Sequence, residues 1–207
     1  GVILGYAAIL KEEAAGESSG HAAAVLNSAL RMRSLIEDMT NMNLLQEGSA
    51  AIQLELQPIQ PVVRSAYDEV FEIIQATGLR SELRMSEAPF PVMADAAKLG
   101  MALTNLLNNA MRFTPSGGTL EVEVERRGIE AWVKVHDSGK GIPAPELERI
   151  FDQFYQVEDH MTRRQGGMGL GLAIVKAIAK GHGGRVWAES AGPDKGTTMT
   201  IALPIRE

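Results

Sequence analysis

The chain has 207 residues, a formal net charge of −6 and no cysteine. Its length and apolar content are enough for one large or two small domains, while the lack of cysteine excludes a disulfide framework and a thiolate metal site. The negative charge argues against nucleic acid or anionic lipid as the main binding partner, and no apolar run approaches the ~18 residues that a transmembrane helix needs.

Residues 1–50 have the spacing of a helical hairpin. Residues 1–14 and 19–46 each carry apolar side chains at helical intervals, and the sequence GESSG at 16–20 interrupts the pattern. The apolar stripe of the second helix follows steps of four and three through Val25, Ala29, Met32, Ile36, Met39 and Met42. A hairpin is too thin to bury both of its faces, so we expect a homodimer in which two copies form a four-helix bundle. The alternative is a hairpin that packs on its own domain.

The chain begins with the apolar sequence GVILGYAAIL, without a methionine or a helix cap. We therefore expect it to be a fragment of a longer protein. We expect this part to be cytoplasmic, and any membrane anchor to belong to segments outside this chain.

The pattern changes at residue 51, and strands and helices are mixed from there to residue 207. Strands are predicted at residues 51–57, 79–85, 91–95, 119–137 (a hairpin that turns near Arg127 and Gly128), 185–190 and 197–204. Helices are predicted at residues 61–78, 95–113, about 146–150, and directly after the glycines at 166–171. The order lacks βαβ regularity, so we expect an α+β protein in which the hairpin at 1–50 precedes a two-layer α/β sandwich at 51–207.

The helix predicted over residues 95–113 has an unusual polar face. At 100° per residue its leucines fall on one side, while Asn105, Asn109 and Arg112 fall together on the other. Asparagine is a mediocre helix former, so its repetition in one helix needs an explanation. Amide carbonyls are suitable ligands for a hard cation such as Mg²⁺, and Arg112 could bind a phosphate. A solvated polar face is the alternative interpretation.

The sequence HDSGKGIP at residues 136–143 follows a predicted strand. Gly139 and Gly141 permit tight turning and a close approach of ligand to backbone. Asp137 is either a simple turn residue or an acceptor for the exocyclic amino group of adenine. Such a charged hydrogen bond contributes about 1.5–3 kcal/mol, whereas guanine presents an oxygen there, which a carboxylate repels.

The sequence RRQGGMGLGLAIVK at residues 163–176 places glycines directly before an apolar helix. It lacks the last glycine of the GxGxxG pattern and the Lys-Ser/Thr of the Walker A pattern. Backbone amides of residues 169–172 could still bind polyphosphate at the start of the helix. Arg163 and Arg164, just upstream, are placed for a terminal phosphate. The alternative is a flexible turn with two solvated arginines.

Together, and in this order, these stretches resemble the sensor histidine kinases of two-component signalling over essentially the whole chain. TNLLNNAMRFTPSGG is similar to the N box of that family, DSGKGIP to its first glycine box and FDQFYQ to its F box. GGMGLGLAIVKAIAKGHGG is similar to the second glycine box, and GTTMTIALP to the terminal strand motif. The resemblance implies the Bergerat ATP-binding fold, which gyrase, mismatch-repair and heat-shock chaperone ATPases share.

The resemblance also implies cofactors and residue roles. ATP and Mg²⁺ are expected, with Asn109 holding the metal, Asn105 supporting it, and Arg112, Arg163 and Arg164 acting on the phosphates. Phe113 would lie beside adenine, Asp137 would accept from its amino group, and Thr197 would support that end. The remaining nucleotide-binding positions are Gly139, Gly141, Ile142, Gly167, Gly169, Leu170, Gly171 and Leu172. The segment around the last five would be a phosphate lid, anchored by Phe151 and Phe154.

Asn105 favours phosphoryl transfer over hydrolysis. Hydrolytic relatives carry a glutamate at this position to activate water, and an amide cannot act as a base. A kinase acting on histidine needs no such base, because neutral imidazole is a competent nucleophile near pH 7. The family's acceptor motif would lie immediately before Gly1, and none of the histidines present, including His21 and His160, is in an acceptor motif. We therefore expect a chain that binds Mg-ATP, cannot phosphorylate itself, and belongs to a kinase that passes the phosphoryl group to a response regulator.

Three other functions are compatible with the residues. An ATP hydrolase of the same fold would release phosphate steadily. A serine kinase of the anti-sigma type would leave acid-stable label on serine, although those proteins lack a long hairpin. A nucleotide-sensing interaction module would bind ATP without transferring its phosphate.

Overall fold

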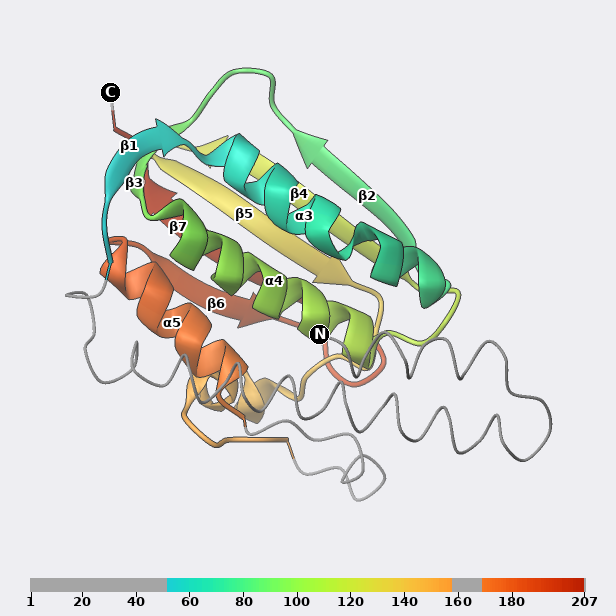
Figure 1. Cartoon of the computed structure of the whole chain (residues 1–207). Helices are drawn as coiled ribbons and strands as arrows, with labels where there is room; N and C mark the ends of the chain where they lie inside the picture. The colour runs from blue at the N-terminus through green and yellow to red at the C-terminus, as the bar shows by residue number, and fades with distance from the viewer. Residues whose placement is uncertain (1–51, 158–168, 207) are drawn as a thin grey trace, which may run out of the picture.

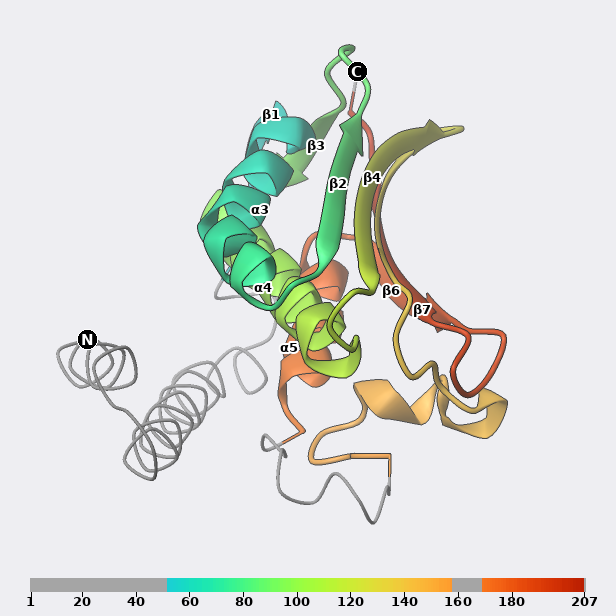
Figure 2. The same ribbon diagram turned by 90° about the vertical axis from the view of Figure 1, so that its right-hand side faces the viewer.

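A five-stranded sheet with helices on one of its faces makes up most of the described part of the chain (Figures 1 and 2). The computed structural model describes residues 52–157 and 169–206. The hairpin predicted at residues 1–50 lies outside them. The described part has the expected α+β character, with helices packed on a mixed sheet.

The large sheet has the strand order β2-β4-β5-β7-β6. Its strands are β2 (Arg80–Met85), β4 (Thr119–Arg127), β5 (Glu130–Asp137), β6 (Arg185–Glu189) and β7 (Thr197–Pro204). Strand β2 pairs with β4 in parallel, and all other pairs in this sheet are antiparallel. The first strand, β1 (Glu55–Pro58), forms a separate antiparallel pair with β3 (Pro91–Ala94).

Strict alternation along β5 determines which side chains face the helices. Ala131, Val133 and Val135 are buried, while the residues between them are partly exposed on the opposite face. Because successive side chains of a strand point to opposite sides, Asp137 continues the buried series at the strand end. A carboxylate therefore lies on the inner side of the sheet, between the sheet and the helix layer.

Three helices cover that inner side: α3 (Ile59–Ala76), α4 (Ala96–Phe113) and α5 (Gly171–Gly181). Helix α4 lies between the other two (Figure 1) and buries its leucine side as predicted. Asp95 caps its start, since its Oδ1 accepts a hydrogen bond from the backbone N–H of Lys98 at 3.0 Å. None of the helices described combines the length and apolar character needed to cross a bilayer.

Two predicted helix positions differ from the structure. Helix α3 begins at Ile59, ahead of the predicted Pro61, because a proline in the first turn replaces an N–H that has no partner within the helix anyway. The short helix predicted near residues 146–150 is instead two 3₁₀ turns, Ala144–Glu146 and Arg149–Phe151.

A buried histidine joins the ends of two helices. His182, at the C-terminal end of α5, contacts the carbonyl oxygen of Ile178 through Nδ1 at 2.8 Å. Its Nε2 accepts a hydrogen bond from the backbone N–H of Asp95 at 3.0 Å. The two partners are consistent with a neutral ring that carries its proton on Nδ1. His182 thus links the end of α5 to the start of α4.

Candidate functional site

Three segments that are far apart in the sequence meet at one end of the helix layer. They are the C-terminal half of α4, the loop after β5 (residues 137–142, the DSGKGI loop) and the start of α5. The backbone N–H of Lys140 donates to the carbonyl of Phe113 at 3.1 Å, which joins the first two. A β-carbon placed on Gly171 would lie 3.2 Å from Oδ1 of Asn105, which brings the third against the first. The structure thus brings the described residues of all three motifs together.

Helix α4 presents its polar face to this meeting point. Asn105 and Asn109 are half-buried and Arg112 is exposed, one turn apart along the same side. The Asn105 amide nitrogen donates to the carbonyl of Met101 at 3.2 Å, so the amide is held with its oxygen toward Gly171. Arg112 lies over the ring of Phe113, 5.2 Å from its centroid. The phenyl ring itself is 42% exposed, which leaves an aromatic surface open beside the DSGKGI loop.

Asp137 is a buried carboxylate with few partners of its own. Its Oδ1 accepts a hydrogen bond from the backbone N–H of Gly139 at 2.8 Å. Burial raises the pKa of the Asp137 carboxyl, and the backbone N–H of Gly139, the neighbouring His136 and the backbone N–H of Thr197 only partly oppose that rise. Thr197 is buried and is the strand partner of Asp137 on β7. A buried carboxylate whose ionised form is disfavoured suits a donor supplied from outside the chain.

The glycines of the DSGKGI loop are required by close backbone contacts. A β-carbon on Gly139 would lie 2.4 Å from the carbonyl oxygen of Phe113. Gly141 has a φ of +65°, and its β-carbon would lie 2.1 Å from the carbonyl oxygen of Gly192. Ile142, the last residue of the loop, packs against the core. Glycine is therefore the residue that fits at both positions.

The start of α5 has no side-chain cap. Its cap position is held by Leu170, which is fully buried and makes no side-chain hydrogen bond to the helix. The first N–H groups of such a helix point out of its end and favour an anion. Leu172 packs against the core on the first turn.

The segment before α5 is held by backbone contacts. Gly169, with a φ of +73°, accepts a hydrogen bond from the backbone N–H of Phe154 at 3.0 Å. Phe151 is buried, whereas the ring of Phe154 is 59% exposed, so the backbone of Phe154 makes the link and its side chain does not. The remaining predicted positions, Arg163, Arg164 and Gly167, lie outside the described residues.

The loop between β6 and β7, residues 190–196, also contacts the DSGKGI loop. The backbone N–H of Ile142 donates to Oγ of Ser190 at 3.0 Å, and that of Gly196 donates to the carbonyl of Gly139 at 3.0 Å. Sequence reasoning missed these residues. The run SAGPDKG does signal a turn, but a turn signal does not tell which other loop it contacts.

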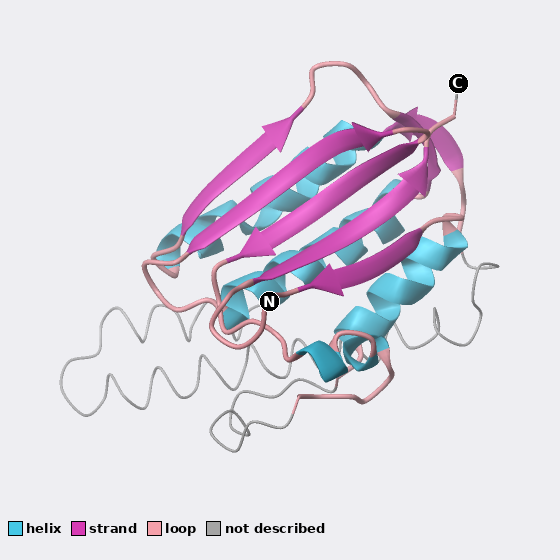
Figure 3. Cartoon of the chain, turned by 180° about the vertical axis from the view of Figure 1, so that it is seen from behind, coloured by secondary structure: helices cyan, strands magenta, loops and turns pink. Residues whose placement is uncertain are grey.

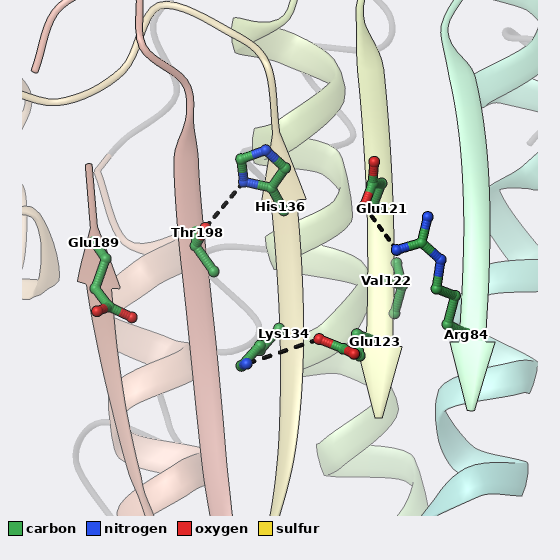
Figure 4. A pocket seen from close by; sticks show the side chains of 8 residues that line it. All are labelled: Arg84, Glu121, Val122, Glu123, Lys134, His136, Glu189 and Thr198. Carbon is green, nitrogen blue, oxygen red and sulfur yellow. Dashed lines mark hydrogen bonds and ion pairs between the residues drawn. The ribbon is translucent and has the colours of Figure 1, made fainter. Parts of the chain in front are cut away.

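The face of the sheet opposite the described helices is turned toward the viewer in Figure 3. A groove of about 400 Å³ lies on that face (Figure 4). Its cations are compensated, since Arg84 pairs with Glu121 at 3.4 Å and Lys134 with Glu123 at 3.7 Å. His136, whose Nδ1 contacts the hydroxyl of Thr198 at 2.9 Å, also lines it. The charges of the groove therefore do not converge on a ligand, and the groove lies on the other face of the sheet from Asp137 and the helices.

The side chains of α4 that could bind a metal ion at this site are the amides of Asn105 and Asn109. Within residues 52–157 and 169–206, no group of three His, Cys, Asp or Glu side chains is placed to hold a metal ion. A hard cation here would be held by the amide oxygen of Asn109 together with phosphate oxygens and water. This donor set fits Mg²⁺, which keeps several waters and is commonly bound through substrate phosphates.

Residues 94–207 match the family described as Histidine kinase-, DNA gyrase B-, and HSP90-like ATPase. The chain is 35% identical over 185 residues to the sensor histidine kinase WalK of Bacillus subtilis. The aligned region covers 87% of the present chain and 30% of WalK. The chain thus spans less than a third of the length of this curated relative.

Two solved structures extend the similarity to the fold. The structure of full-length ShkA in complex with AMPPNP is 25% identical in sequence and has a TM-score of 0.72. The match covers 98% of the present chain and 42% of the ShkA chain. The histidine kinase ThkA in complex with the response regulator protein TrrA is 21% identical, covers 99% of this chain and 57% of that chain, and has a TM-score of 0.71. At that identity the second likeness shows a shared fold.

Proposed function

Because the chain belongs to the histidine kinase-, DNA gyrase B- and HSP90-like ATPase family, with an ATP-binding domain of the sensor histidine kinase kind, we propose that it is the ATP-binding core of a kinase that phosphorylates histidine. The observation that carries the proposal is the meeting of α4, the DSGKGI loop and the start of α5 at one end of the helix layer. These segments together supply a base-recognition group, an aromatic surface and anion-binding N–H groups.

The adenine end of the nucleotide is assigned to the DSGKGI loop. The buried Asp137 accepts a hydrogen bond from the exocyclic amino group, because one of its oxygens is already fixed by Gly139 and the other is oriented by the strand. The exposed ring of Phe113 lies beside the base. Thr197 supports Asp137 from the neighbouring strand. Gly139, Gly141 and Ile142 shape the backbone around this end.

The phosphate end is assigned to α4 and the start of α5. Asn109 would hold Mg²⁺, which when bound neutralises charge on the phosphates. Arg112 contacts a phosphate, and the backbone N–H groups of residues 169–172 bind the polyphosphate at the helix start. Arg163, Arg164 and Gly167 remain assigned to this end by motif alone.

Asn105 sets the reaction toward transfer. Its amide is held between the Met101 carbonyl and Gly171, and an amide cannot remove a proton from water. Catalysis then consists of positioning the γ-phosphate and excluding water. An imidazole nitrogen attacks the γ-phosphorus, the bond to the bridging oxygen breaks, ADP leaves and the imidazole loses its N–H proton.

The acceptor histidine and the partners complete the proposal. The acceptor precedes Gly1 in the parent protein, so the chain as it stands binds Mg-ATP without phosphorylating itself. We assign the dimerisation hairpin to residues 1–50 from the sequence pattern alone, and we propose that the phosphoryl group passes on to an aspartate of a response regulator. The response regulator is proposed as partner because one relative is named a sensor histidine kinase and one solved structure is a histidine kinase in complex with a response regulator protein. A cytoplasmic location is proposed on the same grounds.

The test follows the γ-phosphate of labelled ATP. A version of the chain extended by an acceptor motif ahead of Gly1 is compared with the same version in which that histidine is replaced by glutamine. Acid-labile label that the replacement abolishes supports the kinase. Label recovered only as free phosphate indicates a hydrolase, and acid-stable label on serine indicates a serine kinase. Binding without any turnover would leave a nucleotide-sensing module as the function.

A further inference from the structure

We propose that Ser190 is a positioning residue for the adenine end of the nucleotide, although it lies outside the motifs and at the end of β6. The proposal rests on the proposed function, since it requires the DSGKGI loop to bind the nucleotide. The observation behind the proposal is that residues 190–196, here called the clasp loop, are hydrogen-bonded to the DSGKGI loop at several positions.

The Ser190 hydroxyl uses all of its hydrogen-bonding capacity. Its oxygen accepts from the backbone N–H of Ile142 at 3.0 Å and from that of Gly192 at 3.3 Å. Its proton is donated to the carbonyl of Gly196 at 2.7 Å. A hydroxyl has one donor and two acceptor sites, so all three are occupied. One side chain thus fixes both ends of the clasp loop and the last residue of the DSGKGI loop.

Two backbone hydrogen bonds continue the connection. The N–H of Asp194 donates to the carbonyl oxygen of Lys140 at 2.6 Å, and the N–H of Gly196 donates to the carbonyl oxygen of Gly139 at 3.0 Å. Asp194 adopts a φ of +60°, which aspartate and asparagine hold more readily than other non-glycine residues. The clasp loop is therefore hydrogen-bonded to the DSGKGI loop at Gly139, Lys140 and Ile142.

The contact at Gly141 explains why the hydrogen bonds of the clasp loop should affect nucleotide binding. A β-carbon on Gly141 would lie 2.1 Å from the carbonyl oxygen of Gly192, so the two loops touch backbone to backbone. Removing the Ser190 hydroxyl frees Gly192 and Ile142 at once. The Ile142 end of the DSGKGI loop is then held less tightly, although the backbone hydrogen bonds at Gly139 and Lys140 remain, and the ordering that the hydroxyl provided must be supplied when the nucleotide binds.

The experiment measures ATP and adenosine binding to the 207-residue chain by calorimetry. Ser190→Ala should weaken both ligands by the same factor, about threefold to tenfold, since of the three hydrogen bonds lost the one to Ile142 acts directly on the adenine end that both ligands share. Ser190→Thr, which restores a hydroxyl, should recover most of the affinity. If Ser190→Ala does not fold, Ser190→Cys, of similar volume and with a weaker donor, is measured instead.

The matched control is Ser81→Ala. Ser81 accepts a hydrogen bond from the hydroxyl of Tyr67 at 2.7 Å on β2, at the other edge of the sheet, so its loss destabilises the fold without touching the clasp loop. Equal effects of the two substitutions on affinity would overturn the proposal, as would a loss confined to ATP with adenosine unaffected.

Hydrogen exchange provides a readout that does not depend on affinity. The amide of Ile142 should exchange faster in Ser190→Ala than in Ser81→Ala, and equal protection would also overturn the proposal. If the unaltered chain binds no ATP, the proposed function itself has failed. If it binds ATP and Asp137→Asn weakens that binding while Ser190→Ala does not, only the role of Ser190 is wrong.

Discussion

Replacing Asp137 with asparagine should separate ligand recognition from stability. One carboxylate oxygen is fixed by the N–H of Gly139 at 2.8 Å, so the new amide nitrogen must take the other position. A donor then faces the amino group of adenine. The hydrogen bond lost is worth about 1.5–3 kcal/mol, which corresponds to about a 10- to 150-fold weaker ATP affinity. The same amide can donate to the oxygen of guanine, so the preference for ATP over GTP should shrink or reverse.

The nucleotide-free protein should respond in the opposite direction. Burial raises the pKa of the Asp137 carboxyl in the folded chain above its ordinary value of 3.8. The folded state then holds the proton more tightly than the unfolded state, so this group's contribution to stability falls as pH rises through that window. Asp137→Asn removes a buried carboxyl group whose charged form burial disfavours, so the melting temperature without nucleotide should be unchanged or higher.

Calorimetric titration with ATP and GTP, together with thermal unfolding from pH 4 to pH 8, measures both effects. Asp68→Asn, at an exposed position of α3, is the matched control and should change neither quantity. An ATP affinity within twofold of the unaltered chain would refute the assignment of Asp137 to adenine. A melting temperature lowered well below that of the control would refute the reasoning from burial.

Three further substitutions test the framework around the site. His182→Ala leaves two buried polar groups unpaired and should cost about 2–4 kcal/mol, or about 5–15 °C of melting temperature, whereas His136→Ala on the open sheet face should cost less than about 1 kcal/mol. Gly141→Ala should unfold at lower denaturant and bind ATP weakly, while Gly100→Ala, with no atom within 4 Å, should gain about 0.5–1 kcal/mol in urea titrations. Burial alone would raise the pKa of Asp95, but hydrogen bonds from the backbone N–H groups of Lys98 and Gln53, together with the charge of Lys98, outweigh it, so the pKa is lowered below 3.8. Its stabilisation is therefore present above that pH and lost as pH falls through the lowered pKa; Asp95→Asn, which keeps a capping side chain, should show a smaller loss of stability on acidification between pH 5 and pH 2.

Local patterns predicted the elements and much of the candidate site. The 3.6-residue period separated the leucines of α4 from Asn105 and Asn109, and the structure has the same division. Alternation predicted the β4–β5 hairpin, whose turn at Gly128 has a φ of +61°. Both signals act between residues a few positions apart, where backbone geometry alone decides which side chains share a face.

Non-local pairings could not be predicted in this way. The parallel pairing of β2 with β4 and the separation of β1 and β3 into their own sheet depend on how the whole helix layer packs. The hydrogen bond between His182 and Asp95 joins residues 87 positions apart. The contact of Ser190 with Ile142 spans 48 positions. Periodicity says nothing about such contacts, because each depends on a turn that brings two finished elements together.

The two ends of the candidate site are therefore built from different kinds of structure. The end proposed to bind adenine depends on strand register, which places Asp137 on the inner side of the sheet, and on loops in backbone contact, where even one methyl group does not fit. The phosphate end depends on side chains of one helix face, such as Arg112, and on the uncapped start of α5. A rigid end suits the choice of base, because discrimination requires groups that cannot rearrange around the wrong one. Side chains on a helix surface suit phosphoryl transfer, in which charge must be met as it shifts between oxygens. Substitutions at the first end should accordingly change which nucleotide binds, and substitutions at the second should change what happens to its γ-phosphate.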